Sequence, residues 1–130
     1  MGGNAEVVER LIKAFSEGDV DAALAELDPE VELVPIRAQL EGTNYRGHEG
    51  YRRVLADFEE DWGELRLIPE QLRESGDRVL VTGRMVAKGK ASGVELDIPL
   101  ALLYQLRDRK VVRLESFADP DEGIRAAGID

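Results

Sequence analysis

The spacing of apolar residues changes from a helical to an alternating period near Gly63. Before that point, apolar side chains recur every three or four residues, which predicts helices with one buried face. After it, four segments alternate apolar and polar residues and are joined by short turns, which predicts antiparallel neighbouring strands. A chain with its helices first and its strands afterwards is expected to be α+β, with the helices packed on one face of the sheet.

Three helices are expected before Gly63. The first has Asn4 as its N-cap and ends at Gly18, and the second is capped by Asp19 and stopped by Asp28-Pro29. The third carries an apolar stripe made of Tyr51, Val54, Leu55, Phe58 and Trp62. A short strand at 31–36 and a polar connection at 42–47 lie between the second and third helices. The four later strands are expected at 65–73, 78–88, 94–106 and 110–118.

Length and charge limit what the chain can bind. Its 130 residues contain no repeat or linker, so a single domain spanning residues 1–130 is expected. The net charge of −10 makes nucleic acid and anionic membranes poor partners. The chain has no cysteine, which excludes disulfides and thiolate metal sites, and neither a metal nor a cofactor is expected. The longest apolar run, 98–106, is too short to cross a bilayer and no signal peptide is visible, so the sequence predicts a cytoplasmic protein.

Residue parity predicts which face of the sheet meets the helices. The inward set consists of Val79, Val81, Met85, Ala87, the even-numbered residues from Leu96 to Tyr104, and those from Val112 to Ala118. Burying this set removes the most apolar area from water. The other face carries charged residues such as Arg84 and Asp97, with Leu103 and Phe117 among them. That mixture predicts a homodimer formed through the outer face of the sheet.

Several motifs accompany this order of elements. They are Ala14-Phe15 with Gly18-Asp19, Tyr45-Arg46-Gly47 before the third helix, and Asp119-Pro120 followed by Ala126-Ala127-Gly128. With them, the chain resembles the SnoaL-like branch of the nuclear-transport-factor-2-like superfamily (ketosteroid isomerase-like, cystatin-like) from Val7 to Ile129. The resemblance implies a cone-shaped barrel, in which N-terminal helices pack on a strongly curved, mostly antiparallel sheet. It also implies a hydrophobic or amphipathic ligand inside the cone and dimerisation through the outer sheet face.

The catalytic residues of three familiar enzyme groups of the superfamily have no counterparts here. Positions that correspond to the acids and bases of ketosteroid isomerases fall on or near Leu11, Leu33 and Pro99, none of which can transfer a proton. The Arg-x-Asp pair of limonene epoxide hydrolases does not occur in the predicted strands. SnoaL-type cyclases pair a histidine with an aspartate on late strands, whereas the only histidine of this chain is His48, on the third helix.

Four polar side chains remain as weak candidates for chemistry. The Tyr104 hydroxyl either bonds a ligand carbonyl or lies in water near the end of its strand, and Ser116 either contacts the ligand or bonds backbone. Asp119 ends the last strand, but the following Pro120 favours an N-cap. Histidine is a residue type that often serves as a general base, yet His48 is expected in the first turn of a helix, where a polar residue is ordinary.

The last hairpin departs from the family pattern. The family often has Asp-Gly-Lys there, whereas this chain has Asp108-Arg109-Lys110. Either Arg109 takes a left-handed conformation at some cost, or the turn is of another type.

A ligand pocket is expected between the helices and the sheet. Its predicted lining is Phe15, Phe58, Trp62, Met85, Leu100, Leu102, Tyr104, Leu114 and Ser116. This lining favours a protein that binds a small, largely apolar molecule, with catalysis weak or absent. Two alternatives stay open. One is a cyclase, isomerase or epoxide hydrolase-like enzyme acting on a polyketide- or terpenoid-like compound, and the other is a structural dimerisation module.

Overall fold

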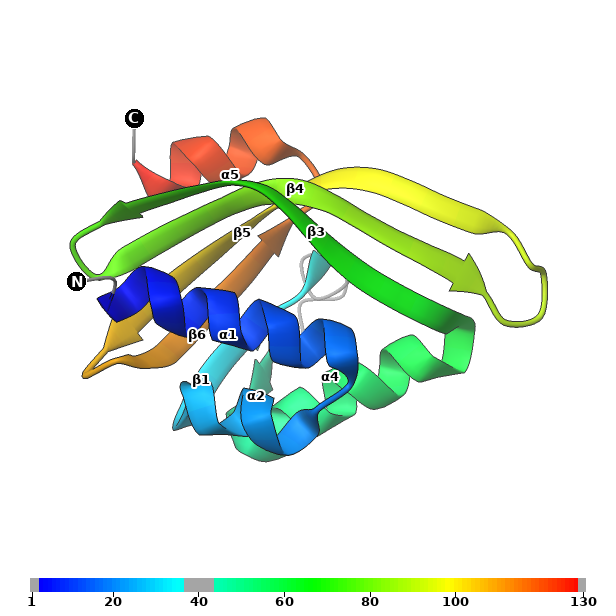
Figure 1. Ribbon diagram of the computed structural model, residues 1–130, viewed down its shortest axis with the longest axis horizontal. Coiled ribbons are helices and arrows are strands. Elements are labelled where there is room, and N and C mark those ends of the chain that lie inside the picture. Colours follow the sequence, from blue (N-terminus) through cyan, green and yellow to red (C-terminus); the bar gives the residue numbers. More distant parts are fainter. Residues whose placement is uncertain (1–2, 37–43, 129–130) are drawn as a thin grey trace.

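The computed structural model describes residues 3–36 and 44–128, whose strands form one six-stranded sheet with helices on both sides (Figure 1). The helices are α1 (Gly3–Glu17), α2 (Val20–Glu26), α4 (Gly47–Asp61) and α5 (Pro120–Ala127). The strands are β1 (Leu27–Val34), β2 (Tyr45–Arg46), β3 (Trp62–Ser75), β4 (Arg78–Gly89), β5 (Glu95–Arg107) and β6 (Lys110–Phe117). Their order is β2-β1-β6-β5-β4-β3, antiparallel except for the β1–β6 pair. The expected α+β class and mostly antiparallel sheet are therefore confirmed.

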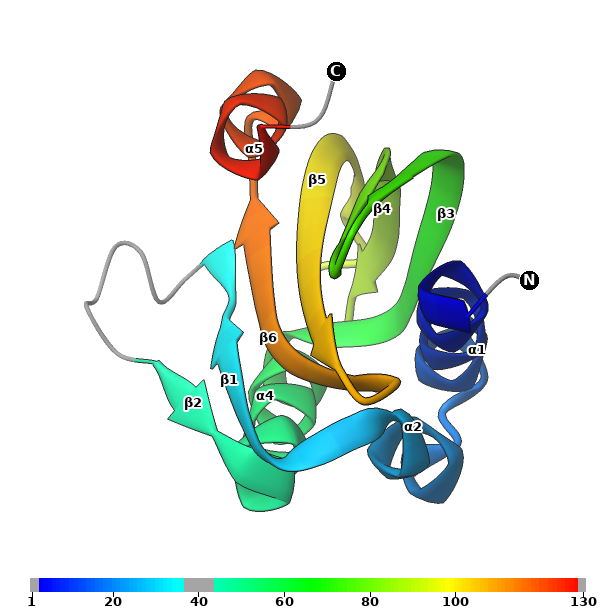
Figure 2. The ribbon, with the colours of Figure 1, turned by 90° about the vertical axis from the view of Figure 1, so that its left-hand side faces the viewer.

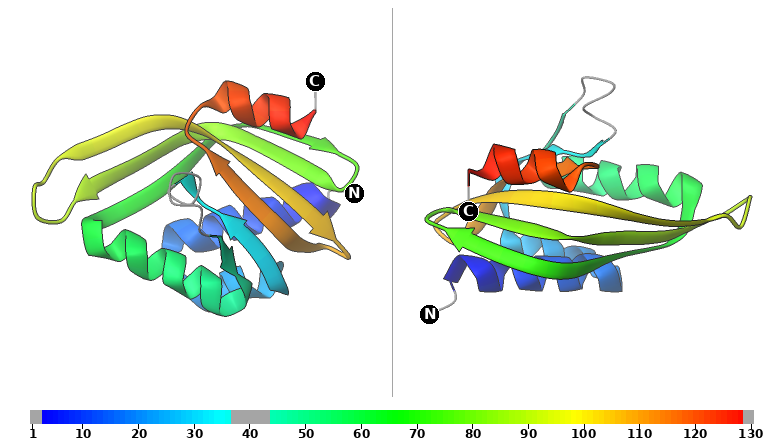
Figure 3. Two further views of the ribbon diagram at one scale, coloured as in Figure 1. Left: turned by 180° about the vertical axis from the view of Figure 1, so that it is seen from behind. Right: turned by 90° about the horizontal axis from the view of Figure 1, so that it is seen from above.

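The sheet is strongly curved but open. Its edge strands β2 and β3 stay apart, so the cone does not close into a barrel (Figure 2). Helices α1, α2 and α4 lie on the concave side, whereas α5 lies on the opposite, convex side (Figures 1 and 3). The concave face of the sheet thus faces α1, α2 and α4, and the convex face is covered by α5 (Figures 1 and 3).

The main core joins the concave face of the sheet to α1 and α4. Its sheet residues include Val79, Val81, Leu100, Leu102 and Tyr104, all of them in the predicted inward set. The pairing of β4 with β5 keeps this parity, since Val79 opposes Tyr104 and Val81 opposes Leu102. The prediction of which face meets the helices is confirmed for these two strands.

Strand β6 departs from simple alternation at its start. Arg113 pairs with Gln105 and Val111 pairs with Leu106, so the register shifts there and Val112 is the extra residue of a bulge. Val111 is consequently fully buried in the core, and Val112 is not among the core residues. The inward placement predicted for Val112 is therefore wrong. That of Ala118 is wrong as well, because β6 ends at Phe117 and Ala118 is exposed.

Some element boundaries also differ from the sequence predictions. Helix α1 begins at Gly3, so Asn4 is not its N-cap, and the Asn4 side-chain amide instead donates to the Gly76 carbonyl in the β3–β4 turn. Strand β1 begins at Leu27 and contains Pro29, which is tolerated because pairing with β6 is irregular between residues 27 and 32. Within the expected connection at 42–47, residues 42 and 43 lie outside the described part of the chain, while Tyr45 starts β2.

Helix α5 covers the apolar residues of the convex face. Leu103 and Phe117, which suggested a subunit interface, are only 9% and 7% exposed. They belong to a second core cluster with Leu80, Ala101, Ile124 and Ala127. Because α5 accounts for their apolar character, they no longer support an intermolecular contact, and the homodimer stays a prediction. Arg84 and Asp97 lie on this face as expected and form an exposed ion pair, with 2.7 Å between Nε and Oδ1.

The β5–β6 turn shows how the chain replaces the usual glycine. Asp108 and Arg109 have φ angles of 52° and 63°, so both residues are left-handed, as in a type I′ turn. Of the two alternatives left open by the sequence, the left-handed Arg109 is the one observed.

Candidate ligand-binding site

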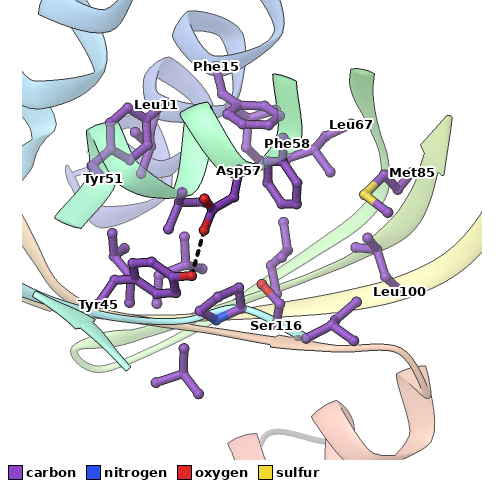
Figure 4. A pocket seen from close by; sticks show the side chains of 18 of the residues that line it. Leu11, Phe15, Tyr45, Tyr51, Asp57, Phe58, Leu67, Met85, Leu100 and Ser116 are labelled. Carbon is purple, nitrogen blue, oxygen red and sulfur yellow. Dashed lines mark hydrogen bonds between the residues drawn. The ribbon is translucent and has the colours of Figure 1, made fainter. Parts of the chain in front are cut away.

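A cavity of about 540 Å³ lies between the concave face of the sheet and helices α1 and α4 (Figure 4). This volume is within the range of small-molecule sites in proteins. All nine residues predicted to line a pocket contribute to its wall: Phe15, Phe58, Trp62, Met85, Leu100, Leu102, Tyr104, Leu114 and Ser116. Their role in binding a ligand stays a prediction.

The sheet supplies one wall through its alternation. Met85 on β4 pairs with Ile98 on β5, and Leu102 pairs with Ser116 on β6, so the inward side chains of three strands form a continuous surface. The helices supply the opposite wall, from Leu11 and Phe15 on α1 and from Tyr51, Val54 and Phe58 on α4. This arrangement follows directly from the two periods of the sequence. The placement of Trp62 on the third helix is wrong, because α4 ends at Asp61 and Trp62 begins β3, from which it lines the cavity.

Aromatic side chains are concentrated in this cavity. The chain has three phenylalanines, three tyrosines and one tryptophan. Six of these seven line the cavity: Phe15, Tyr45, Tyr51, Phe58, Trp62 and Tyr104. The seventh, Phe117, is packed under α5. The site therefore presents flat, polarisable surfaces suited to an aromatic or polycyclic molecule.

A carboxylate that the sequence analysis did not identify also enters the cavity. Asp57 on α4 accepts a hydrogen bond from the Tyr45 hydroxyl, with 2.6 Å between Oη and Oδ2 (Figure 4). Tyr45 is placed by the pairing of β2 with β1, where it opposes Leu33. Asp57 follows Val54 by three residues and precedes Phe58, so it lies at the edge of the apolar stripe of α4. That spacing was the only sequence signal that could have distinguished Asp57 from the other acidic residues of α4.

Two buried tyrosines are also among the residues that line the cavity. Tyr51 on α4 is 6% exposed, and burial raises its pKa to about 12. Tyr104 on β5 is 1% exposed, and its pKa is also raised, first by burial and then by the neighbouring Tyr51. Both phenols are therefore neutral hydrogen-bond donors at ordinary pH. The alternative that the Tyr104 hydroxyl lies in water is wrong, because Tyr104 is enclosed by the core.

Two of the candidate side chains lie outside the cavity wall. The His48 Nε2 atom is 3.0 Å from the Leu27 carbonyl oxygen, so the imidazole connects the start of α4 to the start of β1. The Asp119 carboxylate accepts from the Asp121 backbone N–H at 3.0 Å and caps α5, as the N-cap interpretation predicted. Ser116 lies in the wall, and its hydroxyl points into the cavity (Figure 4).

Two further features concern residues 3–36 and 44–128 alone. No helix in these ranges combines the length and the apolar character needed to cross a bilayer. In the same ranges, no three histidine or acidic side chains gather as a metal site would require.

The fold is shared with solved structures of low sequence identity. A nuclear-transport-factor-2-like protein of unknown function from Burkholderia pseudomallei K96243 is 24% identical, with a TM-score of 0.83 over 96% of this chain and 97% of that chain. TerC, co-crystallised with polyporic acid, is 26% identical, with a TM-score of 0.82 over 97% and 98%. A protein provisionally described as a SnoaL-like polyketide cyclase, from Jannaschia sp. CCS1, is 22% identical, with a TM-score of 0.78 over 88% and 84%.

A comparison with curated proteins finds no match. The family model of the SnoaL-like domain, in contrast, matches residues 8–114, which is most of the chain and includes β1 to β5 and the first part of β6. The chain therefore belongs to the SnoaL-like domain family.

Proposed function

We propose that this protein binds a small, largely apolar molecule in the cavity between α4 and the concave face of the sheet. The observation that carries the proposal is the cavity of about 540 Å³ with its aromatic and aliphatic wall. Sites of this kind hold ligands by apolar contact and orient them with a few polar groups, which here include Asp57, Ser116 and the Tyr45 hydroxyl. The similar protein TerC was co-crystallised with polyporic acid, which supports a small organic ligand for this fold.

Binding is favoured over catalysis because the described wall lacks an acid–base pair. Asp57 is its one carboxylate, and no lysine, arginine or histidine of the described residues lines the cavity. General acid–base catalysis needs positioned groups that can both take up and release a proton near neutral pH. With their raised pKa values, Tyr51 and Tyr104 are weak acids in this role.

A titration with N-phenyl-1-naphthylamine tests the proposal. This neutral aromatic dye fluoresces more strongly in apolar surroundings, so we expect a saturable increase with the wild-type protein. Met85→Trp and Leu100→Phe place extra volume inside the cavity and should abolish or strongly weaken the signal. Val94→Trp adds the same indole ring at an exposed position next to the β4–β5 turn, where Val94 is 59% exposed, and should leave the signal unchanged.

Circular dichroism of each variant identifies those that keep the wild-type fold. If a folded Met85→Trp or Leu100→Phe variant binds the dye as the wild type does, the dye lies elsewhere and the proposal is wrong.

A cyclase or isomerase is the second candidate, since Asp57 brings one possible proton acceptor to the cavity. The provisional description of the Jannaschia protein as a polyketide cyclase agrees with it. Such an enzyme should convert a polyketide-like test compound, as followed by chromatography, and Asp57→Asn should abolish this conversion while its circular dichroism spectrum stays that of the wild type. Conversion that is unaffected by Asp57→Asn would exclude this role for Asp57.

A further inference from the structure

The charge inside the cavity is one-sided. Among the described lining residues, Asp57 carries the only carboxylate, and none carries a basic side chain. A ligand with a carboxylate would therefore bring a second negative charge into an apolar site whose described lining offers it no basic side chain, which is costly. A ligand with a hydroxyl or a protonated amine would instead find an acceptor.

The Asp57 carboxylate is held in place by a hydrogen bond from the Tyr45 hydroxyl. The 2.6 Å separation of its Oδ2 atom from the Tyr45 hydroxyl is typical of a charge-assisted O–H···O⁻ bond. The two residues come from α4 and β2, so the bond joins separate elements. The guanidinium of Arg53 lies 6.0 Å from the centre of the Tyr45 ring and contributes a cation–π contact. One phenol uses only one of about four acceptor positions of a carboxylate, so acceptor capacity remains for a ligand.

The surroundings of Asp57 favour the same kind of ligand. Six aromatic rings line the cavity, and aromatic faces attract both aromatic bodies and ammonium groups. The net charge of −10 makes the protein as a whole attract cations and repel anions. The carboxylate in the cavity, the aromatic rings and the net charge of the protein therefore favour the same kind of ligand, although they are separate properties of the sequence.

We infer that Asp57 anchors a ligand whose aromatic or polycyclic body carries a hydrogen-bond donor, either a hydroxyl or a protonated amine, and that the cavity discriminates against carboxylates. This inference rests on the proposed function, because it assumes that the cavity is the binding site. Asp57 accepts the donor's hydrogen through the oxygen positions that Tyr45 leaves available. The aromatic rings contact the apolar body.

Four naphthalenes that differ at a single position test the inference by displacement of N-phenyl-1-naphthylamine. 2-Naphthol offers a neutral donor, 2-naphthylmethylamine a cationic donor, 2-methylnaphthalene no donor, and 2-naphthoate a negative charge. We expect at least one of the two donors to bind roughly tenfold more tightly than 2-methylnaphthalene, as a hydrogen bond to a charged group provides. 2-Naphthoate should bind most weakly of the four.

Asp57→Asn should remove the advantage of the donors and improve the binding of 2-naphthoate. Asp97→Asn is the matched control, since it makes the same chemical change in the exposed ion pair on the convex face and should preserve the wild-type ranking. Preference for the amine alone identifies charge as the feature recognised, and preference for naphthol alone identifies the neutral hydroxyl. Both results support the inference.

Other outcomes overturn it. Equal binding of all four compounds to the wild type would keep the proposed function and refute the selectivity. Tightest binding of 2-naphthoate, or an unchanged ranking in Asp57→Asn, would also refute it. If the dye binds but none of the four displaces it, the inference is wrong while the proposed function stands; if the dye itself does not bind, both are wrong. The wild-type ranking decides these cases even if Asp57→Asn does not fold.

Discussion

Replacement of Gly83 by alanine should destabilise the protein severely, because the backbone of β3 occupies the space that a Cβ on this residue of β4 would need. An added Cβ would be 2.2 Å from the Ile68 carbonyl oxygen and 3.0 Å from Pro69 Cα, both of them backbone atoms. Carbon–oxygen contacts are normally about 3.3 Å or longer, so the two strands would have to separate by about 1 Å. β3 has a register irregularity between Pro69 and Gln71, opposite Gly83, and such bulges bend a sheet.

The loss of stability can be estimated from the backbone hydrogen bonds between β3 and β4. Separating the strands there weakens one or two backbone hydrogen bonds at about 1 kcal/mol each, and the remaining crowding adds a similar amount. We therefore expect a loss of about 2–4 kcal/mol in the free energy of unfolding. For a chain of this length that corresponds to a decrease of about 10 °C in Tm, measurable by circular dichroism.

Gly63→Ala is the matched control for this prediction. It makes the same change in β3, where an added Cβ would have its nearest neighbours at 3.6 Å (Lys90 Cγ) and 3.7 Å (Lys88 O), both ordinary contacts. Its free energy of unfolding should stay within about 0.5 kcal/mol of the wild-type value. If the two variants melt at the same temperature, the close approach at Gly83 does not exist and the curvature has another origin.

Three further predictions follow from the backbone and the buried tyrosines. Gly123→Ala should lower the free energy of unfolding by about 1–3 kcal/mol in urea titrations, because the added Cβ would lie 2.4 Å from the Cβ of Ala101. This loss is expected although alanine is the better helix former. A stabilised variant would show that α5 does not pack closely on the sheet. Arg109→Gly should raise stability by about 0.5–1 kcal/mol in a thermal melt by relieving a left-handed residue, and a lower Tm would contradict the type I′ turn. Because burial raises the pKa of Tyr51 from about 10 to about 12, the folded state holds this proton more strongly than the unfolded chain. Stability should therefore be complete below about pH 10 and fall by roughly 2–3 kcal/mol as the pH rises toward 12. Tyr51→Phe should reduce this fall, and an identical pH dependence in the variant would refute the assignment.

Much of the architecture could be predicted from periodicity. Alternation on β4 and β5 placed Val81, Met85 and Leu102 correctly because burial of one face fixes the register of neighbouring strands. The N-caps Asp19 and Asp119 were predictable for a local reason, since each carboxylate satisfies a backbone N–H of the next helix.

The remaining differences arise where non-local packing overrides a local pattern. The bulge that brings Val111 inward depends on how β6 pairs with β5, and no residue type at this point of the sequence indicates it. The apolar residues Leu103 and Phe117 suggested a subunit interface, because a short helix after the last strand does not reveal in sequence which face of the sheet it covers.

Asp57 was missed for a related reason. The third helix contains several acidic residues, and a carboxylate at the edge of an apolar stripe has the same sequence pattern as one in solvent. Only the position of Tyr45 on β2, twelve residues earlier, gives Asp57 a partner inside the cavity. The chemistry of the site therefore depends on a contact between elements that periodicity cannot predict.

A crystal structure of the protein soaked with 6-bromo-2-naphthol would test the central claim most directly, since bromine is located by its anomalous scattering. The account predicts a bromine peak inside the cavity, near Met85 and Leu100, with the naphthol oxygen within hydrogen-bond distance of the Asp57 carboxylate. A cavity filled by Phe58 and Trp62, with no bromine between α4 and the sheet, would contradict it.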